Sequence, residues 1–157
     1  MKQNNLTAIK NRLIKMICIG TFGGCIYVGC EYIFRGYSHP TMFLLAFIVS
    51  QLLMILNDTI LEMNDYYEYQ LFCGTFICTV FEYIFGIIFN SNYTIWDYRN
   101  MPFTLHFLDD QVNLIFILAW LFICSWGIPL MDYLQWRSGL GERPYYRVYL
   151  LNKTIYL

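Results

Sequence analysis

Charged residues are scarce in this sequence of 157 residues. Asp, Glu, Lys and Arg make up 13% of it, against about 25% in soluble domains, whereas hydrophobic residues make up 58%. The formal net charge is −1 and no basic run is interleaved with aromatics, so the sequence does not indicate binding to nucleic acid. The composition predicts an integral membrane protein, whose first partner is the lipid bilayer.

Several motifs of enzymes and nucleotide-binding proteins are also missing. The sequence contains no G-x-x-x-x-G-K-[ST] loop for ATP phosphates, no H-E-x-x-H and no G-x-S-x-G. Its six cysteines form no C-x-x-C pair and fall within apolar stretches, so we expect them to be packing residues rather than disulfides or zinc ligands. We therefore expect no metal site, no cofactor and no enzymatic activity.

Four apolar stretches approach the length of about 20 residues that a helix needs to cross a bilayer. They lie at about 13–34, 41–58, 71–89 and 112–131. The second stretch spans only if it tilts, thins the bilayer or continues through Asn57 to Leu61. We therefore expect an all-α, polytopic membrane bundle of about four transmembrane helices over 13–131, preceded by a cytoplasmic segment 1–12 and followed by a cytoplasmic or interfacial tail 132–157.

Basic residues predict the orientation of the bundle. Most of them lie near the chain ends: Lys2, Lys10, Arg12, Lys15, Arg137, Arg143, Arg147 and Lys153. The two loops on the opposite side carry only Arg35 and Arg99. Because basic residues are enriched in cytoplasmic loops, we expect both termini to be cytoplasmic.

The third stretch contains a single carboxylate, Glu82, which is costly in a bilayer unless it finds a partner. It lies on a line of small residues spaced by four, which share one side of a helix. Small residues let neighbouring helices approach closely. The residues that we assign to helix packing, here and in the first stretch, are Gly20, Gly24, Gly74, Cys78 and Gly86. We therefore expect Glu82 to face the interior of the bundle.

Two roles remain open for Glu82: it lines a transport path, or it is protonated and joins helices as a structural hydrogen bond. Other polar residues lie near the predicted outer face. Glu31 and Arg35 are four residues apart, in the favourable order for a helical ion pair. An outward-facing cluster above Glu82 would contain Glu31, Arg35, His39, Asp97 and Arg99.

Three segments carry a more specific pattern: EYIFRGYSHPTM (31–42), FEYIFGIIFN (81–90) and WDYRNMPF (96–103). Together they resemble a family of small bacterial membrane proteins classed as ABC-transporter permeases. That family has a Glu before an Arg-Gly-x-Ser-His turn, a Glu in an E-x-x-x-G helix and a Trp-Asp-Tyr-x-x-x-Pro loop. The residues that we assign to a transport path or a structural polar cluster are Glu31, Arg35, His39, Glu82, Trp96, Asp97, Tyr98 and Arg99.

The resemblance implies a transporter subunit in the cytoplasmic (inner) membrane of a bacterium. Because the sequence has no ATP-binding loop, the ATP-binding subunit would be a separate chain. Four spans are few for a translocation path, so a homodimer or a further membrane subunit is also expected. The sequence departs from the family pattern at Thr104, where the family has Asn, and at Asp110, where it has Gly.

Two alternatives belong to other functional classes. The chain could be a small accessory or scaffold membrane protein whose polar residues hold helices together. It could also be a membrane-embedded lipid-modifying enzyme, with Glu82 or His39 as acid or base and Asp97 holding a metal. The adjacent Asp109 and Asp110 do not help the enzyme hypothesis, because neighbouring residues point apart on a helix.

Overall fold

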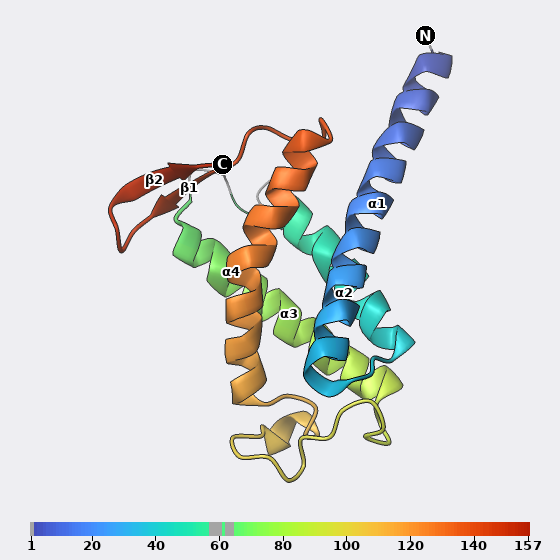
Figure 1. Ribbon diagram of the computed structural model, residues 1–157, viewed down its shortest axis with the longest axis vertical. Helices are drawn as coiled ribbons and strands as arrows, with labels where there is room; N and C mark the ends of the chain where they lie inside the picture. Colours follow the sequence, from blue (N-terminus) through green and yellow to red (C-terminus); the bar gives the residue numbers. More distant parts are fainter. Residues whose placement is uncertain (1, 57–60, 62–64) are drawn as a thin grey trace.

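Within residues 2–56, 61 and 65–157, which the computed structural model describes, the apolar stretches form four α-helices. The helices are α1 (Lys2–Arg35), α2 (Pro40–Ile55), α3 (Tyr67–Phe89) and α4 (Leu114–Arg137). Figure 1 shows them as a bundle, with loop 90–113 at one end and both termini towards the other. This arrangement puts the two basic ends of the chain on the same side, as the predicted orientation requires.

Among the described helices, three are long and apolar enough to cross a membrane: α1 from Thr7 (29 residues), α3 (23 residues) and α4 (24 residues). The predicted helical membrane bundle is thereby confirmed. Helix α2 is shorter, with 16 residues, against the about 20 that a perpendicular span needs. The continuation through Asn57 that would lengthen it falls on residues 57–60, outside the described part of the chain.

Helices α1, α3 and α4 extend beyond the apolar stretches that predicted them. Helix α1 begins at Lys2, so residues 2–12 of the predicted N-terminal segment belong to this helix. Residues 2–19 contain neither Gly nor Pro, and polar residues alone do not end a helix. Helix α4 begins at Leu114 and runs to Arg137, past the predicted end at 131. Hydropathy marks the part of a helix that lies in lipid, not where its backbone hydrogen bonds end.

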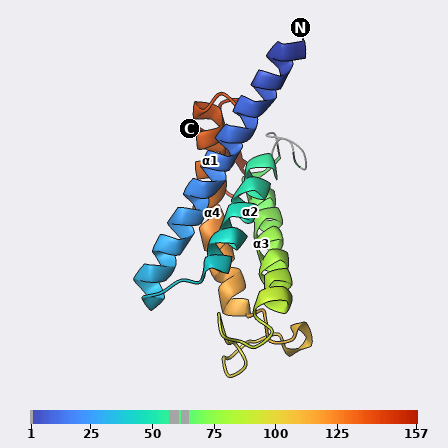
Figure 2. The same ribbon diagram turned by 90° about the vertical axis from the view of Figure 1, so that its right-hand side faces the viewer.

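Helix α1 packs on α2 through glycines. A Cβ atom added at Gly20 would lie 2.1 Å from Gln51 Nε2, and one at Gly24 would lie 2.7 Å from the Phe43 ring. Gly23, which the sequence pattern did not single out, is equally close to Ser50. Figure 2 shows the result, with α2 held between α1 and α3.

The predicted small-residue side of α3 faces α2, α4 and loop 90–113. A Cβ atom at Gly74 would lie 3.1 Å from Ile128 Cδ1, and one at Gly86 would lie 2.7 Å from Gln111 Cβ. The thiols of Cys78 and Cys124 lie 3.6 Å apart and are both free. Gly74, Cys78 and Gly86 therefore lie in contacts between α3 and its neighbours.

Replacing Gly23 by Ala is expected to lower the free energy of unfolding by about 1–3 kcal/mol, the usual cost of overpacking. The added Cβ would lie 2.1 Å from Ser50 Oγ and 2.8 Å from Ser50 Cβ. Gly29→Ala on the same helix is the matched control, because no atom of the part of the chain that the structure describes lies within 4 Å of its added Cβ. Reversible unfolding in mixed micelles should show no loss for Gly29→Ala, since Ala favours helix over Gly. Equal losses for the two variants would contradict this packing.

The tail after α4 forms a β-hairpin, which helical periodicity did not predict. Strands β1 (Tyr145–Val148) and β2 (Lys153–Tyr156) are antiparallel. The Tyr146 hydroxyl donates a hydrogen bond of 2.6 Å to Asp132, and the Glu68 carboxylate accepts from the backbone N–H of Leu150. Figure 1 shows the hairpin beside the first turns of α3. The hairpin is thus fixed to α3 and α4.

Candidate functional site

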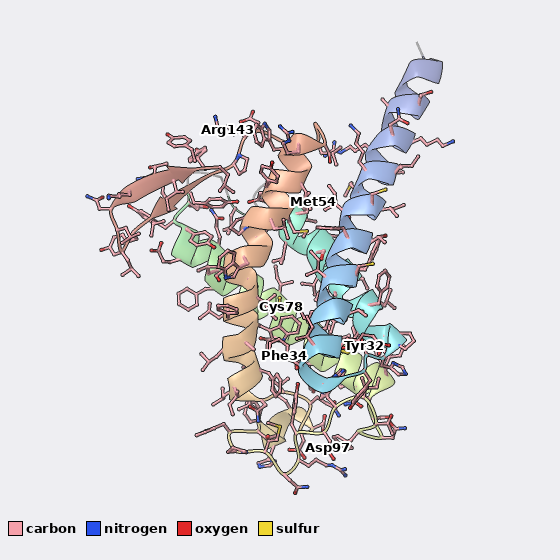
Figure 3. The ribbon with its side chains drawn as sticks, viewed as in Figure 1. Tyr32, Phe34, Met54, Cys78, Asp97 and Arg143 are labelled. Atoms are coloured by element: carbon pink, nitrogen blue, oxygen red, sulfur yellow. The ribbon has the colours of Figure 1, made fainter. Side chains whose placement is uncertain are left out.

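A cavity of about 670 Å³ lies inside the bundle. Side chains of all four helices and of loop 90–113 line it, and most of them are apolar. Its volume is within the range of roughly 300–1,000 Å³ that is usual for small-molecule sites. Figure 3 shows Phe34 on the side of α1 that faces α4, with Cys78 of α3 in the space between these helices.

Glu82 lies in the wall of this cavity and is only 4% exposed. The Tyr98 hydroxyl donates to its Oε1 atom at 2.9 Å, and Trp120 Nε1 donates to its Oε2 atom at 2.8 Å. Burial and the nearby Glu82 carboxylate raise the pKa of Tyr98, which keeps its hydroxyl protonated and able to donate. One carboxylate therefore joins α3 to α4 and to loop 90–113.

Aromatic rings surround these two hydrogen bonds. The ring of Tyr27 stacks on that of Trp120, with centroids 5.5 Å apart, and the ring of Tyr98 stacks on that of Phe116 at 4.6 Å. All four rings line the cavity. Through Tyr27, α1 therefore contacts Trp120, one of the two residues that donate hydrogen bonds to Glu82.

Glu31 and Arg35 form a second polar group in the cavity wall. The predicted ion pair is present, with a distance of 2.7 Å, and Ser38 donates to the other Glu31 oxygen at 2.5 Å. Gly36 has φ +76°, which lets the chain turn back so that Ser38 reaches Glu31. Arg35 also donates to the carbonyl of Ile95 at 3.2 Å. This group ties the end of α1 to loop 90–113.

Two buried amides hold the loop against the bundle. Asn90 accepts from the N–H of Ile95 at 2.8 Å, and donates to the carbonyl of Trp96 at 2.7 Å and to Gln111 Oε1 at 3.0 Å. The indole of Trp96 donates to the carbonyl of Gln111 at 3.2 Å. Both amide residues are at most 2% exposed. They place Trp96 and Tyr98 on the cavity.

Thr104, where the sequence departs from the permease pattern, also supports the loop. Its hydroxyl donates to the carbonyl of Tyr98 at 2.6 Å, and Asn113 donates to the Thr104 hydroxyl at 2.9 Å. Asn113 also caps α4, because its side-chain oxygen accepts from the N–H of Ile115. The loop and the start of α4 therefore form one hydrogen-bonded unit.

The predicted outward-facing cluster is not assembled as a whole. Trp96 and Tyr98 are buried on the cavity, whereas Asp97 and Arg99 are exposed and pair with each other at 2.7 Å. Residues 96–99 belong to neither a helix nor a strand, and their side chains alternate between buried and exposed. His39 is exposed and caps α2 by accepting from the N–H of Thr41. Figure 3 shows Asp97 at the outer end of the loop, away from Cys78.

The exposed ion pair between Asp97 and Arg99 affects the pKa of Asp97. Hydrogen bonds from Arg99 lower the pKa of Asp97 to about 2, so Asp97 remains ionised across the physiological range. The guanidinium also lies 4.3 Å from the centre of the Tyr93 ring. These contacts order the outer surface of the loop and do not involve the cavity.

Four further residues of the site were not identified from the sequence: Tyr27, Asn90, Gln111 and Trp120. A buried Trp usually requires a partner for its N–H, but nothing in the sequence pairs Trp120 with Glu82, 38 positions away. Comparisons with protein-family models, curated proteins and solved structures found no match. The resemblance to permeases therefore stays a prediction.

Proposed function

We propose that this chain is the permease-like membrane subunit of a transporter, with its cavity as part of the substrate path and its ATP-binding subunit on a separate chain. One observation carries the proposal: Glu31 and Glu82, from different helices, line the same cavity. Carboxylates at membrane depth are costly, and those that face a cavity are characteristic of transport paths. The motif resemblance points to the same class.

Loop 90–113 closes one end of this path. Trp96 and Tyr98 form that part of the wall, and the hydrogen bonds from Tyr98 to Glu82 and from Arg35 to the Ile95 carbonyl join it to α3 and α1. Passage of a substrate would require both bonds to open. The glutamates are therefore placed to sense the substrate and to control the loop together.

Purification from native membranes in mild detergent tests this proposal. We expect the tagged wild-type chain to recover an ATP-binding subunit, and Glu82→Gln and Glu31→Gln to retain it, because both glutamates lie inside the cavity rather than on an outer surface. Recovery of this chain alone, or with an unrelated membrane complex, would contradict the transporter proposal.

The accessory-protein alternative has one observation in its favour. Both oxygens of Glu82 already accept hydrogen bonds from within the chain, as they would in a purely structural contact. The same purification distinguishes the transporter from the accessory protein, because an accessory protein would co-purify with its membrane partner and without an ATP-binding subunit.

A further inference from the structure

We propose that the cavity binds an amphiphilic organic cation, an ammonium or phosphonium with apolar substituents, with its charge beside Glu82. This inference rests on the proposed function and deepens it by naming the substrate class. It follows from the charge of the cavity, the rings around Glu82 and the exposed side chains at its rim.

The charges in the cavity wall do not balance. Among the described residues, the lining contains two carboxylates, Glu31 and Glu82, and one guanidinium, Arg35. Glu31 and Arg35 form an ion pair with each other. Both donors to Glu82, a phenol and an indole, are neutral, so neither of them compensates the charge that this carboxylate carries when it is ionised. A cation in the cavity would complete this balance.

The rings around Glu82 suit an organic cation. A ring face attracts a positive charge, and a cluster of rings is the usual site for quaternary ammonium groups. Tyr27 and Trp120 stack at 5.5 Å beside the carboxylate, and Tyr98 and Phe116 lie on the same cavity. A hydrated metal ion fits less well, because most of the wall is apolar and offers few oxygen ligands.

The cavity also reaches the outer surface of the bundle. Phe34 of α1 is 88% exposed and Phe122 of α4 is 68% exposed, and both belong to its lining. Figure 3 places Phe34 towards α4. An amphiphile dissolved in the membrane could therefore enter between α1 and α4, with its apolar part against residues such as Met42 and Val49 of α2.

Two probes of nearly the same shape and opposite charge test the proposal: tetraphenylphosphonium and tetraphenylborate. Calorimetric titration of the purified chain in a neutral detergent should show saturable binding of the cation, and binding of the anion at least about tenfold weaker. Equal binding of the two ions, or no binding of the cation, would overturn the proposal.

Two charge-removing variants test whether the cation binds beside Glu82. Glu82→Gln should weaken binding of tetraphenylphosphonium at least about tenfold, because it removes the uncompensated charge. Asp97→Asn removes an acidic group that lies outside the cavity and should leave binding unchanged. Loss of binding in Asp97→Asn, or full binding in Glu82→Gln, would contradict the assignment.

Gly127→Leu tests the cavity without changing any charge. Among the described residues, a Cβ atom at Gly127 meets only Leu53, at 3.7 Å, so a larger side chain can extend into the cavity. We expect an unchanged midpoint of unfolding and a loss of tetraphenylphosphonium binding of at least about tenfold. Unchanged binding in this folded variant would place the site elsewhere. Because none of these titrations involves another chain, their failure is distinguishable from a failure to recover an ATP-binding subunit.

Discussion

Replacing Glu82 by Ala is expected to lower the free energy of unfolding by about 2–5 kcal/mol. The substitution leaves the Tyr98 hydroxyl and the Trp120 indole N–H buried without their acceptor, and each unsatisfied group costs about 1–3 kcal/mol. It also removes the hydrogen bond that joins Tyr98 of loop 90–113 to α3. Reversible unfolding of the purified protein in mixed micelles measures the loss.

Glu82→Gln is the matched control for this result. Its amide oxygen can accept from Trp120, and its amide nitrogen can donate to the Tyr98 oxygen, so both contacts persist without the charge. We expect this variant to lose less than about 1.5 kcal/mol. If Ala and Gln at this position were equally stable, the hydrogen bonds to Glu82 would not support the fold.

Asn90→Ala is expected to release loop 90–113 and to cost about 2–4 kcal/mol. The variant removes an acceptor for the N–H of Ile95 and donors to the Trp96 carbonyl and to Gln111, in a place with no exposure to water. The N–H of Ile95 should then exchange with solvent much faster than in the wild type. Hydrogen exchange and unfolding experiments measure the two effects.

Asn92→Ala, two residues further on, is the control for the loop. Asn92 is exposed and its side chain accepts only from the neighbouring Thr94. We expect a change within about 0.5 kcal/mol and no change in the exchange of the Ile95 N–H. Similar effects of the two substitutions would show that Asn90 does not anchor the loop.

Local patterns in the sequence predicted the contacts within and between helices. The steps of four through Gly74, Cys78 and Glu82 correctly placed this side of α3 against the bundle, because helical geometry fixes which residues share a side. The Glu31–Arg35 pair follows from the same geometry. The sequence pattern did not identify Gly23 as a packing residue, because Gly23 lies outside the spacing of four that joins Gly20 and Gly24. Its contact with Ser50 depends on the orientation of α2.

The partners of Glu82 could not be predicted in the same way. Tyr98 and Trp120 reach the carboxylate from a loop and from another helix, at separations that no helical period describes. Which side chains of 96–99 face the cavity depends on the irregular backbone of the loop, which buries Trp96 and Tyr98 and leaves Asp97 exposed. That backbone depends in turn on Asn90 and Gln111, whose role appears only when the chain is folded.

The most direct test of a cation site beside Glu82 is an NMR titration of the four tryptophan indole N–H groups with tetraphenylphosphonium. Trp120 donates to Glu82 and, like Trp96, lines the cavity, whereas Trp126 is 70% exposed and lies outside that lining. We predict a large, saturable shift of the Trp120 signal, a smaller one of Trp96, and only a weak, non-saturating change at Trp126. A Trp120 signal that stays in place, or that changes no more than that of Trp126, would contradict a cation site in this cavity.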